Sequence, residues 1–205
     1  MDSDMAPELY TIWSEAKTHI DQGDYDKAIE IYRYVLIRYG DDEIAAEHAN
    51  AYLGDIFLTL TQLDLAENHI KKAISYKPEK PAYHYLLGFI YSKKGQWEMA
   101  IQEFEVATDK EPNNDEYLRG LGWAVYSSGD KAKGLAYLHR AINLAPDNVN
   151  ILNDMAAAYL LMAKFKEAKE FAERAVKIEP QNALAQDVLK NIDRFQRAQG
   201  GFGEQ

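Results

Sequence analysis

Four prolines lie at a constant interval of 34 residues, at Pro78, Pro112, Pro146 and Pro180. The residues around them repeat as well, so the chain consists of copies of one unit. A period of this length accommodates two helices and a turn, and such units stack side by side into an array. Arrays of this kind normally provide a binding surface, so the repeat favours a binding function over a catalytic one.

With each proline at its thirty-second position, the unit occurs five times, at 9–42, 47–80, 81–114, 115–148 and 149–182, with four extra residues at 43–46. The eighth and twentieth positions are always small. The eighth are Ala16, Gly54, Gly88, Gly122 and Ala156, and the twentieth are Ala28, Ala66, Ala100, Gly134 and Ala168. Small residues at facing positions predict that two antiparallel helices approach closely in each unit.

Turn sequences separate the two expected helices of a unit. Gly23, Gly95 and Gly129 stand in three of these turns. Glycine readily takes the left-handed conformation that ends a helix. Each proline in turn closes a second helix. An Asn or Asp that follows it, as in Pro112-Asn113-Asn114-Asp115 and Pro146-Asp147-Asn148, can cap the next helix.

This pattern resembles the tetratricopeptide repeat. The third unit reproduces nearly all of the repeat's signature, in the order Leu87-Gly88, Tyr91, Ala100, Phe104, Ala107 and Pro112. The resemblance covers residues 9–182, and the chain departs from it at His19, Gly40, Gly134 and Ala172. It implies an all-α fold, a right-handed superhelical solenoid of five tetratricopeptide helix-turn-helix repeats.

The two ends of the array carry further segments. Residues 183–198 form an amphipathic pattern, and we expect them to be a capping helix that covers the last repeat. Residues 1–8 are expected to be an N-terminal extension, and residues 199–205 a flexible tail. The insertion 43–46 is expected to add one turn to the first helix of the second unit.

Composition narrows the class of protein. The net charge is −10; residues 1–114 carry all of it, and residues 115–205 sum to zero. This disfavours binding to nucleic acid, because that affinity comes from Lys and Arg. The acidic half could attract a basic partner or simply be a solvated face. The chain has no cysteine, no apolar run long enough to insert into a membrane and no secretory signal at its start, so we expect it to be cytoplasmic.

No pattern of catalytic or metal-binding residues stands out. The five histidines are scattered, with no pair four residues apart. Gly120-Leu121-Gly122 lacks the third glycine of a nucleotide-binding loop, and helix packing explains it better. We therefore expect no enzymatic activity, no cofactor and no metal.

The resemblance also implies which residues face a partner. In the family, the first helices of successive repeats line a concave groove. The corresponding positions here are Trp13, Lys17, Asp55, Tyr85, Phe89, Arg119, Trp123, Tyr126 and Asn153. Aromatic residues and arginine dominate binding hot spots, so the hypothesis centres on those of the third and fourth units, although aromatic residues at helical spacing commonly belong to a core.

The family's clamp for a terminal carboxylate is missing. The positions that would supply its Lys, Asn and Arg residues hold Trp13, Lys17, Asp55, Ala82 and Leu86. Asp55 would repel a carboxylate, so docking of a heat-shock chaperone through that clamp is not expected.

These observations predict a protein-protein interaction module, a scaffold or adaptor that binds a peptide or helix of a partner, with a basic or apolar segment as candidate ligand. Two alternatives stay open. One is a self-assembling repeat protein, in which the tail around Phe202 of one copy enters the groove of another and gives a homo-oligomer. The other is a chaperone for a secreted or membrane-protein client.

Overall fold

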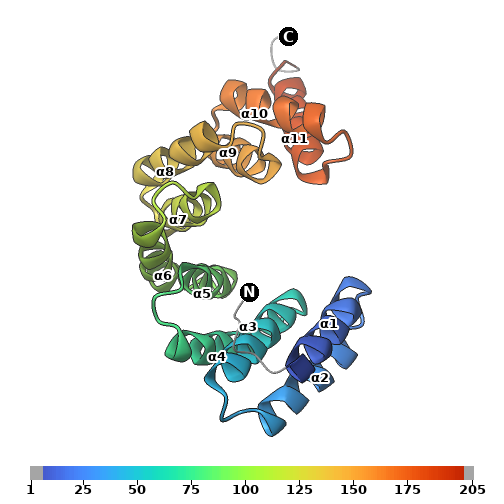
Figure 1. Cartoon of the computed structure of the whole chain (residues 1–205). Coiled ribbons are helices and arrows are strands. Elements are labelled where there is room, and N and C mark those ends of the chain that lie inside the picture. Colours follow the sequence, from blue (N-terminus) through green and yellow to red (C-terminus); the bar gives the residue numbers. More distant parts are fainter. Residues whose placement is uncertain (1–6, 201–205) are drawn as a thin grey trace. The chain divides into compact units, whose positions relative to one another are not determined.

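A computed structural model describes residues 7–200 of the chain, with side chains described for residues 8–195 (Figure 1). Within this range the structure contains eleven α-helices and no strand, so the predicted all-α fold is confirmed. The chain divides into two compact units, Met1–Ala107 and Thr108–Gln205. Each of these two units is larger than the 34-residue repeat and contains at least two helix pairs.

The first unit contains three helix pairs. The pairs are α1 (Pro7–Asp21) with α2 (Tyr25–Arg38), α3 (Glu43–Thr59) with α4 (Leu63–Tyr76), and α5 (Pro81–Lys93) with α6 (Trp97–Lys110), the last of which ends just beyond the unit's boundary. Contacts also join α2 to α3 and α4 to α5. The largest fully buried side chains of these pairs include Tyr32, Leu53, Ile70 and Phe104.

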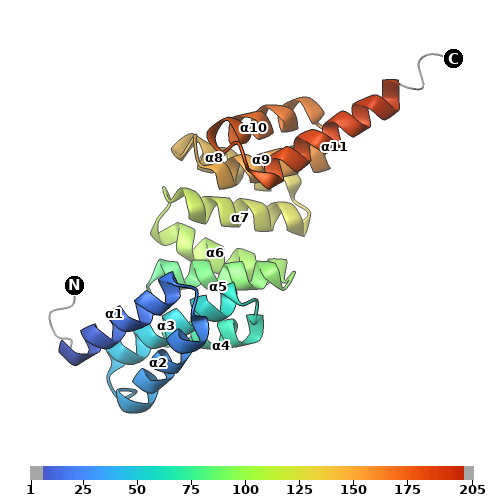
Figure 2. The same cartoon turned by 90° about the vertical axis from the view of Figure 1, so that its right-hand side faces the viewer.

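The second unit contains two pairs and a final helix. The pairs are α7 (Asp115–Ser128) with α8 (Lys131–Leu144) and α9 (Val149–Leu161) with α10 (Phe165–Ile178). The final helix, α11 (Ala183–Gly200), lies along α9 and α10 (Figure 2). Its Val188 and Ile192 are buried in the core of this unit, so α11 covers the apolar side of the last pair.

The turns inside the pairs follow the sequence prediction and extend it. Gly23, Gly95 and Gly129 have φ angles of 75°, 71° and 117°, so all three take the predicted left-handed conformation. Thr61 and Ala163 occupy the equivalent turns of the second and fifth repeats with φ of 58° and 56°. The left-handed turn is therefore common to all five repeats, although only three of them use glycine for it.

Small residues bring the helices of a pair together as expected. A Cβ atom added to Gly88 on α5 would lie 2.8 Å from the ring of Phe104 on α6. One added to Gly54 on α3 would lie 2.4 Å from the side chain of Ile70 on α4. These contacts are too short for any real Cβ atom, so the large core residue of each second helix occupies the space that glycine leaves.

The observed ends of the helices differ slightly from the boundaries expected from the sequence. α1 begins at Pro7, within the segment expected to be an extension, and α11 continues to Gly200, two residues past the expected capping helix. α3 begins at Glu43 and is capped by Asp42, so residues 43–46 form its first turn. Residues 201–205, with Phe202, lie outside the described residues. Within the described residues, every helix is too short or too polar to cross a membrane.

Candidate functional site

The residues expected to face a partner are divided between the two units. In the first unit Trp13 and Lys17 lie on α1, Asp55 on α3, and Tyr85 and Phe89 on α5. In the second unit Arg119, Trp123 and Tyr126 lie on α7 and Asn153 on α9. All nine positions are therefore on the first helices of pairs.

A cleft of about 330 Å³ opens between α3 and α5 of the first unit. Its lining residues are His48, Ala51, Tyr52 and Asp55 from α3, Lys80, and Tyr83 and Leu86 from α5. We call it the α3–α5 cleft. It contains one of the nine expected residues, Asp55, beside a largely apolar surface.

A buried glutamate anchors one end of the α3–α5 cleft. Glu47 is only 2% exposed, and it accepts hydrogen bonds from the Tyr83 hydroxyl and from Lys80 Nζ, the latter at 3.0 Å. Burial alone would raise the pKa of the Glu47 carboxyl, but these two donors hold it below its usual value. Lys80 is thus engaged by a carboxylate that is fixed in place.

Asp55 lines the same α3–α5 cleft, but its surroundings differ from those of Glu47. Its carboxylate makes no hydrogen bond or ion pair with any residue in the described part of the chain. The side chain is exposed to water, yet the surrounding protein atoms displace enough solvent to raise its pKa. The cleft therefore holds one negative charge that the protein does not compensate locally.

Trp13 and Lys17 lie on α1. The ring of Trp13 stacks on His48 with centroids 4.8 Å apart, so it adjoins the cleft through that histidine. Its Nε1 atom is buried and has no hydrogen-bond partner among the described residues. Lys17 is exposed and pairs with Asp21 at 3.5 Å, one turn along α1.

Tyr85 and Phe89 form an aromatic pair on α5. Their ring centroids are 6.5 Å apart, and Tyr85 also contacts the ring of Phe104, 5.6 Å away. Lys93 Nζ lies 5.1 Å from the Phe89 ring centroid. Both aromatic rings are half-buried, so one side of each packs inward while the other meets solvent.

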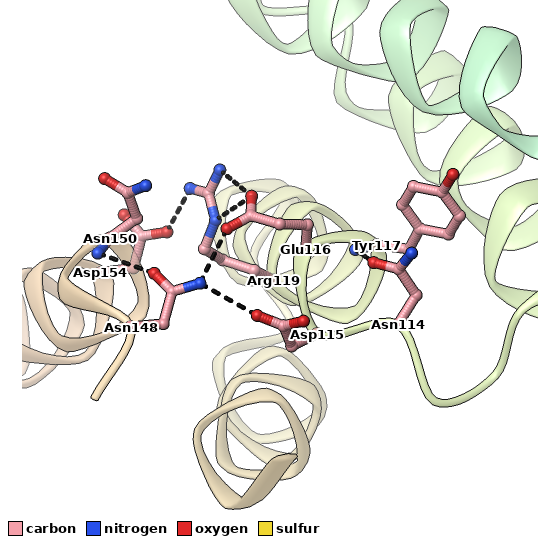
Figure 3. A network of polar contacts seen from close by, with 8 residues as sticks. All are labelled: Asn114, Asp115, Glu116, Tyr117, Arg119, Asn148, Asn150 and Asp154. Carbon is pink, nitrogen blue, oxygen red and sulfur yellow. Dashed lines mark hydrogen bonds and ion pairs between the residues drawn. The ribbon is translucent and has the colours of Figure 1, made fainter. Parts of the chain in front are cut away.

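Arg119 is held within a polar network of the second unit (Figure 3). Its guanidinium donates to Glu116 Oε2 at 2.8 and 3.0 Å on α7, and to Asp154 Oδ2 at 2.9 Å on α9. Asn148 extends the network by donating to Glu116 Oε1 at 3.0 Å and to Asp115 Oδ2 at 2.9 Å. The arginine thus joins α7 to α9, a role that its groove position did not predict.

Asp154 is the partner that sequence reasoning missed. Burial raises the pKa of its carboxyl, and the charge of Arg119 opposes this effect. The side chains of Asp154 and Arg119 are 23% and 17% exposed. Arg119 and Asp154 are 35 residues apart in the sequence, close to the 34-residue period of the repeat. Opposite charges at this spacing are the signal that could have identified the pair.

The remaining expected residues of the second unit contribute to packing. Tyr126 is 4% exposed, and its hydroxyl donates to the carbonyl oxygen of Ala158 at 2.9 Å. Asn153 is 8% exposed. Trp123 is half-buried against the core and stacks on Tyr126 with centroids 5.7 Å apart. Of these three, only Trp123 offers surface to a partner.

The residues that the structure describes include no cluster of metal-binding side chains. Among residues 7–200, no three His, Cys, Asp or Glu side chains are close enough together to hold an ion. Two of the carboxylates pair with cationic side chains instead, Glu47 with Lys80 and Asp154 with Arg119.

Comparison with protein families matches the chain to the tetratricopeptide repeat. One model of this repeat matches residues 57–123 and 126–192, and a second matches residues 14–66. The matched segments cover most of the chain and include the α3–α5 cleft and the Arg119 network.

Relatives in sequence are longer proteins. The BBSome complex member BBS4 of Bos taurus is 23% identical over 194 residues, which are 92% of this chain and 36% of that protein. The TPR repeat-containing protein MJ1428 of Methanocaldococcus jannaschii is 29% identical over 161 residues, 78% of this chain and 28% of that protein. The chain thus spans about a third of the length of these relatives.

Solved structures with the same fold include two tetratricopeptide repeat proteins. YrrB, described as a TPR protein with an unusual peptide-binding site, matches with a TM-score of 0.63 at 19% identity over 85% of this chain and 88% of its own. A tetratricopeptide repeat protein from Parabacteroides merdae matches with a TM-score of 0.74 at 13% identity, over 91% of this chain and 73% of its own. At such low identity these matches establish the fold alone.

Proposed function

The chain belongs to the tetratricopeptide repeat family, and on that premise we propose that it is a non-enzymatic interaction module, a scaffold or adaptor that binds a peptide segment of a partner protein. Repeats of this family generally mediate contacts between proteins. The residues that would meet the partner lie on the first helices of the pairs, among them Trp13, Asp55, Tyr85, Phe89 and Trp123.

The observation that carries the proposal is the α3–α5 cleft. It combines an apolar surface, from Ala51, Tyr52 and Leu86, with polar groups at fixed positions, which is typical of a ligand site. Tyr52 is 37% exposed although its ring stacks on Tyr32 with centroids 5.0 Å apart. A rigid, partly exposed aromatic ring buries a large area on binding at little cost in conformational entropy.

Two comparisons support the same function. YrrB, which shares the fold, is described as having a peptide-binding site. BBS4 is described as a member of the BBSome complex. Both descriptions suit a repeat array whose role is to contact another protein.

The test is selection of a phage-displayed library of random 12-residue peptides on the wild-type protein, followed by fluorescence anisotropy with the enriched peptides. Ala51→Trp would fill the α3–α5 cleft with a large ring. Ala136→Trp is the matched control, because Ala136 is an exposed residue of α8 outside the cleft. Circular dichroism would verify that both variants keep the wild-type helix content.

We expect enriched peptides to bind the wild type and Ala136→Trp alike, and to bind Ala51→Trp at least tenfold more weakly. This factor corresponds to about 1.4 kcal/mol. The proposal is wrong if no peptide is enriched, or if the enriched peptides bind all three proteins equally.

A further inference from the structure

We propose that the segment bound in the α3–α5 cleft carries a lysine or arginine side chain that pairs with Asp55, next to an apolar side chain that packs on Tyr52 and Leu86. This inference rests on the proposed function and specifies the chemistry of the partner. It concerns a peptide segment with one defined basic position, rather than any basic protein.

The carboxylate of Asp55 is the first reason. It has no hydrogen-bond or ion-pair partner among residues 8–195, whose side chains the structure describes, and protein atoms around it keep out part of the solvent. A carboxylate in such a place gains more from a cationic partner than one in bulk water, because the lower local polarity strengthens the attraction.

The basic side chains that line the cleft already contact Glu47, which is the second reason. Lys80 lines the same cleft, but its Nζ binds Glu47 Oε1 at 3.0 Å and the Tyr83 hydroxyl at 2.8 Å. His48, the other basic residue of the lining, lies 3.6 Å from Glu47 Oε2 through its Nε2 atom. Glu47 therefore holds both basic groups at its end of the cleft, and Asp55 is left for a charge from outside.

The surface beside Asp55 gives the second half of the motif. Ala51 and Tyr52 precede Asp55 by one helical turn on α3, and Leu86 faces them from α5. Lys and Arg side chains have long apolar stems, so such a residue can lie along this surface with its charged end at the carboxylate. An apolar neighbour in the peptide would cover the rest of Tyr52 and Leu86.

The net charge of the first unit also favours a basic peptide. Residues 1–107 contain 10 Lys and Arg against 19 Asp and Glu, a net charge of −9. A field of this sign accelerates the approach of a basic segment and is screened by salt. Steering alone would not depend on any one carboxylate, so single substitutions distinguish it from pairing at Asp55.

The experiment uses the same random 12-residue library, selected in parallel on the wild type, Asp55→Asn, Asp55→Lys and Asp41→Asn. Asp41 is an exposed carboxylate between α2 and α3, outside the cleft, so Asp41→Asn makes the same change in net charge. For the enriched peptides, each Lys or Arg is then replaced by Gln, and affinities are measured at 0.05 M and 0.5 M NaCl.

We expect peptides from the wild type and from Asp41→Asn to share a Lys or Arg beside an apolar residue. Replacing that residue by Gln should weaken binding to the wild type about tenfold and leave binding to Asp55→Asn unchanged. Selection on Asp55→Lys should instead enrich Asp or Glu at this position. High salt should reduce the difference between the Lys and Gln peptides.

Two failures are distinguishable. If peptides bind in the cleft, so that Ala51→Trp stops them, but show no basic position coupled to Asp55, this inference is wrong while the proposed function stands. If no enriched peptide is sensitive to Ala51→Trp, the proposed function fails, and the inference fails with it.

Discussion

A Cβ atom added to Gly134 on α8 would lie 2.7 Å from the carbonyl oxygen of Gly122 on α7. It would also lie 2.5 Å from the backbone nitrogen of Tyr126. Both neighbours are backbone atoms, which cannot move aside as the end of a flexible side chain can. The departure from alanine at Gly134 therefore coincides with a close approach between the backbones of the two helices of this pair.

Gly134→Ala is expected to lower the free energy of unfolding of the full-length protein by about 2 kcal/mol, because α7 and α8 must separate to admit the methyl group. Urea unfolding followed by circular dichroism measures the change. Ala136→Gly on the exposed side of α8 is the control, with an expected cost of about 1 kcal/mol from lower helix propensity. A Gly134→Ala variant as stable as the wild type would contradict the close approach.

Thr61→Gly and Ala163→Gly are expected to raise stability by about 0.5–1 kcal/mol each, since residues with a Cβ atom are strained at φ near 60°. The gain is limited because glycine also makes the unfolded chain more flexible. Thermal unfolding measures it as a higher Tm. The reverse change, Gly95→Ala at φ of 71°, should lower Tm, and equal Tm values for all variants would contradict the strain.

These turns show how much of the backbone conformation could be predicted from the sequence alone. The 34-residue period and the small residues predicted the helix pairs and the left-handed turns at glycines. Thr61 and Ala163 escaped prediction because their residue types do not favour that backbone, and the packing of the flanking helices imposes it. The register thus predicts where a turn lies better than which residue it contains.

The site was less predictable than the fold. Repeat register placed Asp55 and Trp123 on the correct helices, yet it could not tell how deeply a side chain is buried. Tyr126 occupies a groove position in the register, but its hydroxyl reaches the backbone of Ala158 on α9. Glu47 and Lys80 are 33 residues apart, and their pairing depends on how one repeat rests on the next.

The free energy of unfolding should fall as the pH drops from 7 to 5, in part because of His69. Burial, with Lys72 and Arg33 nearby, lowers the pKa of His69 to about 4. The unfolded chain has the usual pKa near 6.5, so between these values it binds more protons than the folded protein, and acid favours unfolding. The expected contribution of His69 is about 2 kcal/mol at pH 5.

Comparison of the wild type with His69→Gln isolates this contribution. A glutamine can still donate to Asn50 Oδ1, which lies 2.9 Å from His69 Nδ1, but it does not titrate. Urea unfolding at pH 7 and pH 5 should show a smaller acid-induced loss in the variant. Identical losses in both proteins would mean that His69 is protonated in the folded state.

Arg119→Leu is expected to cost about 3 kcal/mol of stability, because it leaves Asp154 largely buried without its cation. The double variant Arg119→Leu with Asp154→Leu should recover much of this loss, since no isolated charge remains. Urea unfolding of the wild type, both single variants and the double variant gives the coupling. Additive effects of the two substitutions would show that the ion pair does not join α7 and α9.

Because Trp13 stacks on His48, the fluorescence of Trp13 can report whether the α3–α5 cleft is occupied. An indole in contact with an imidazole emits differently from one in solvent, and His48 forms part of the cleft wall. Any occupant that shifts this histidine or shields it from water would change the fluorescence of Trp13. Substituting Trp97 and Trp123 by Phe would leave Trp13 as the single tryptophan, so its emission could be followed in the unlabelled protein.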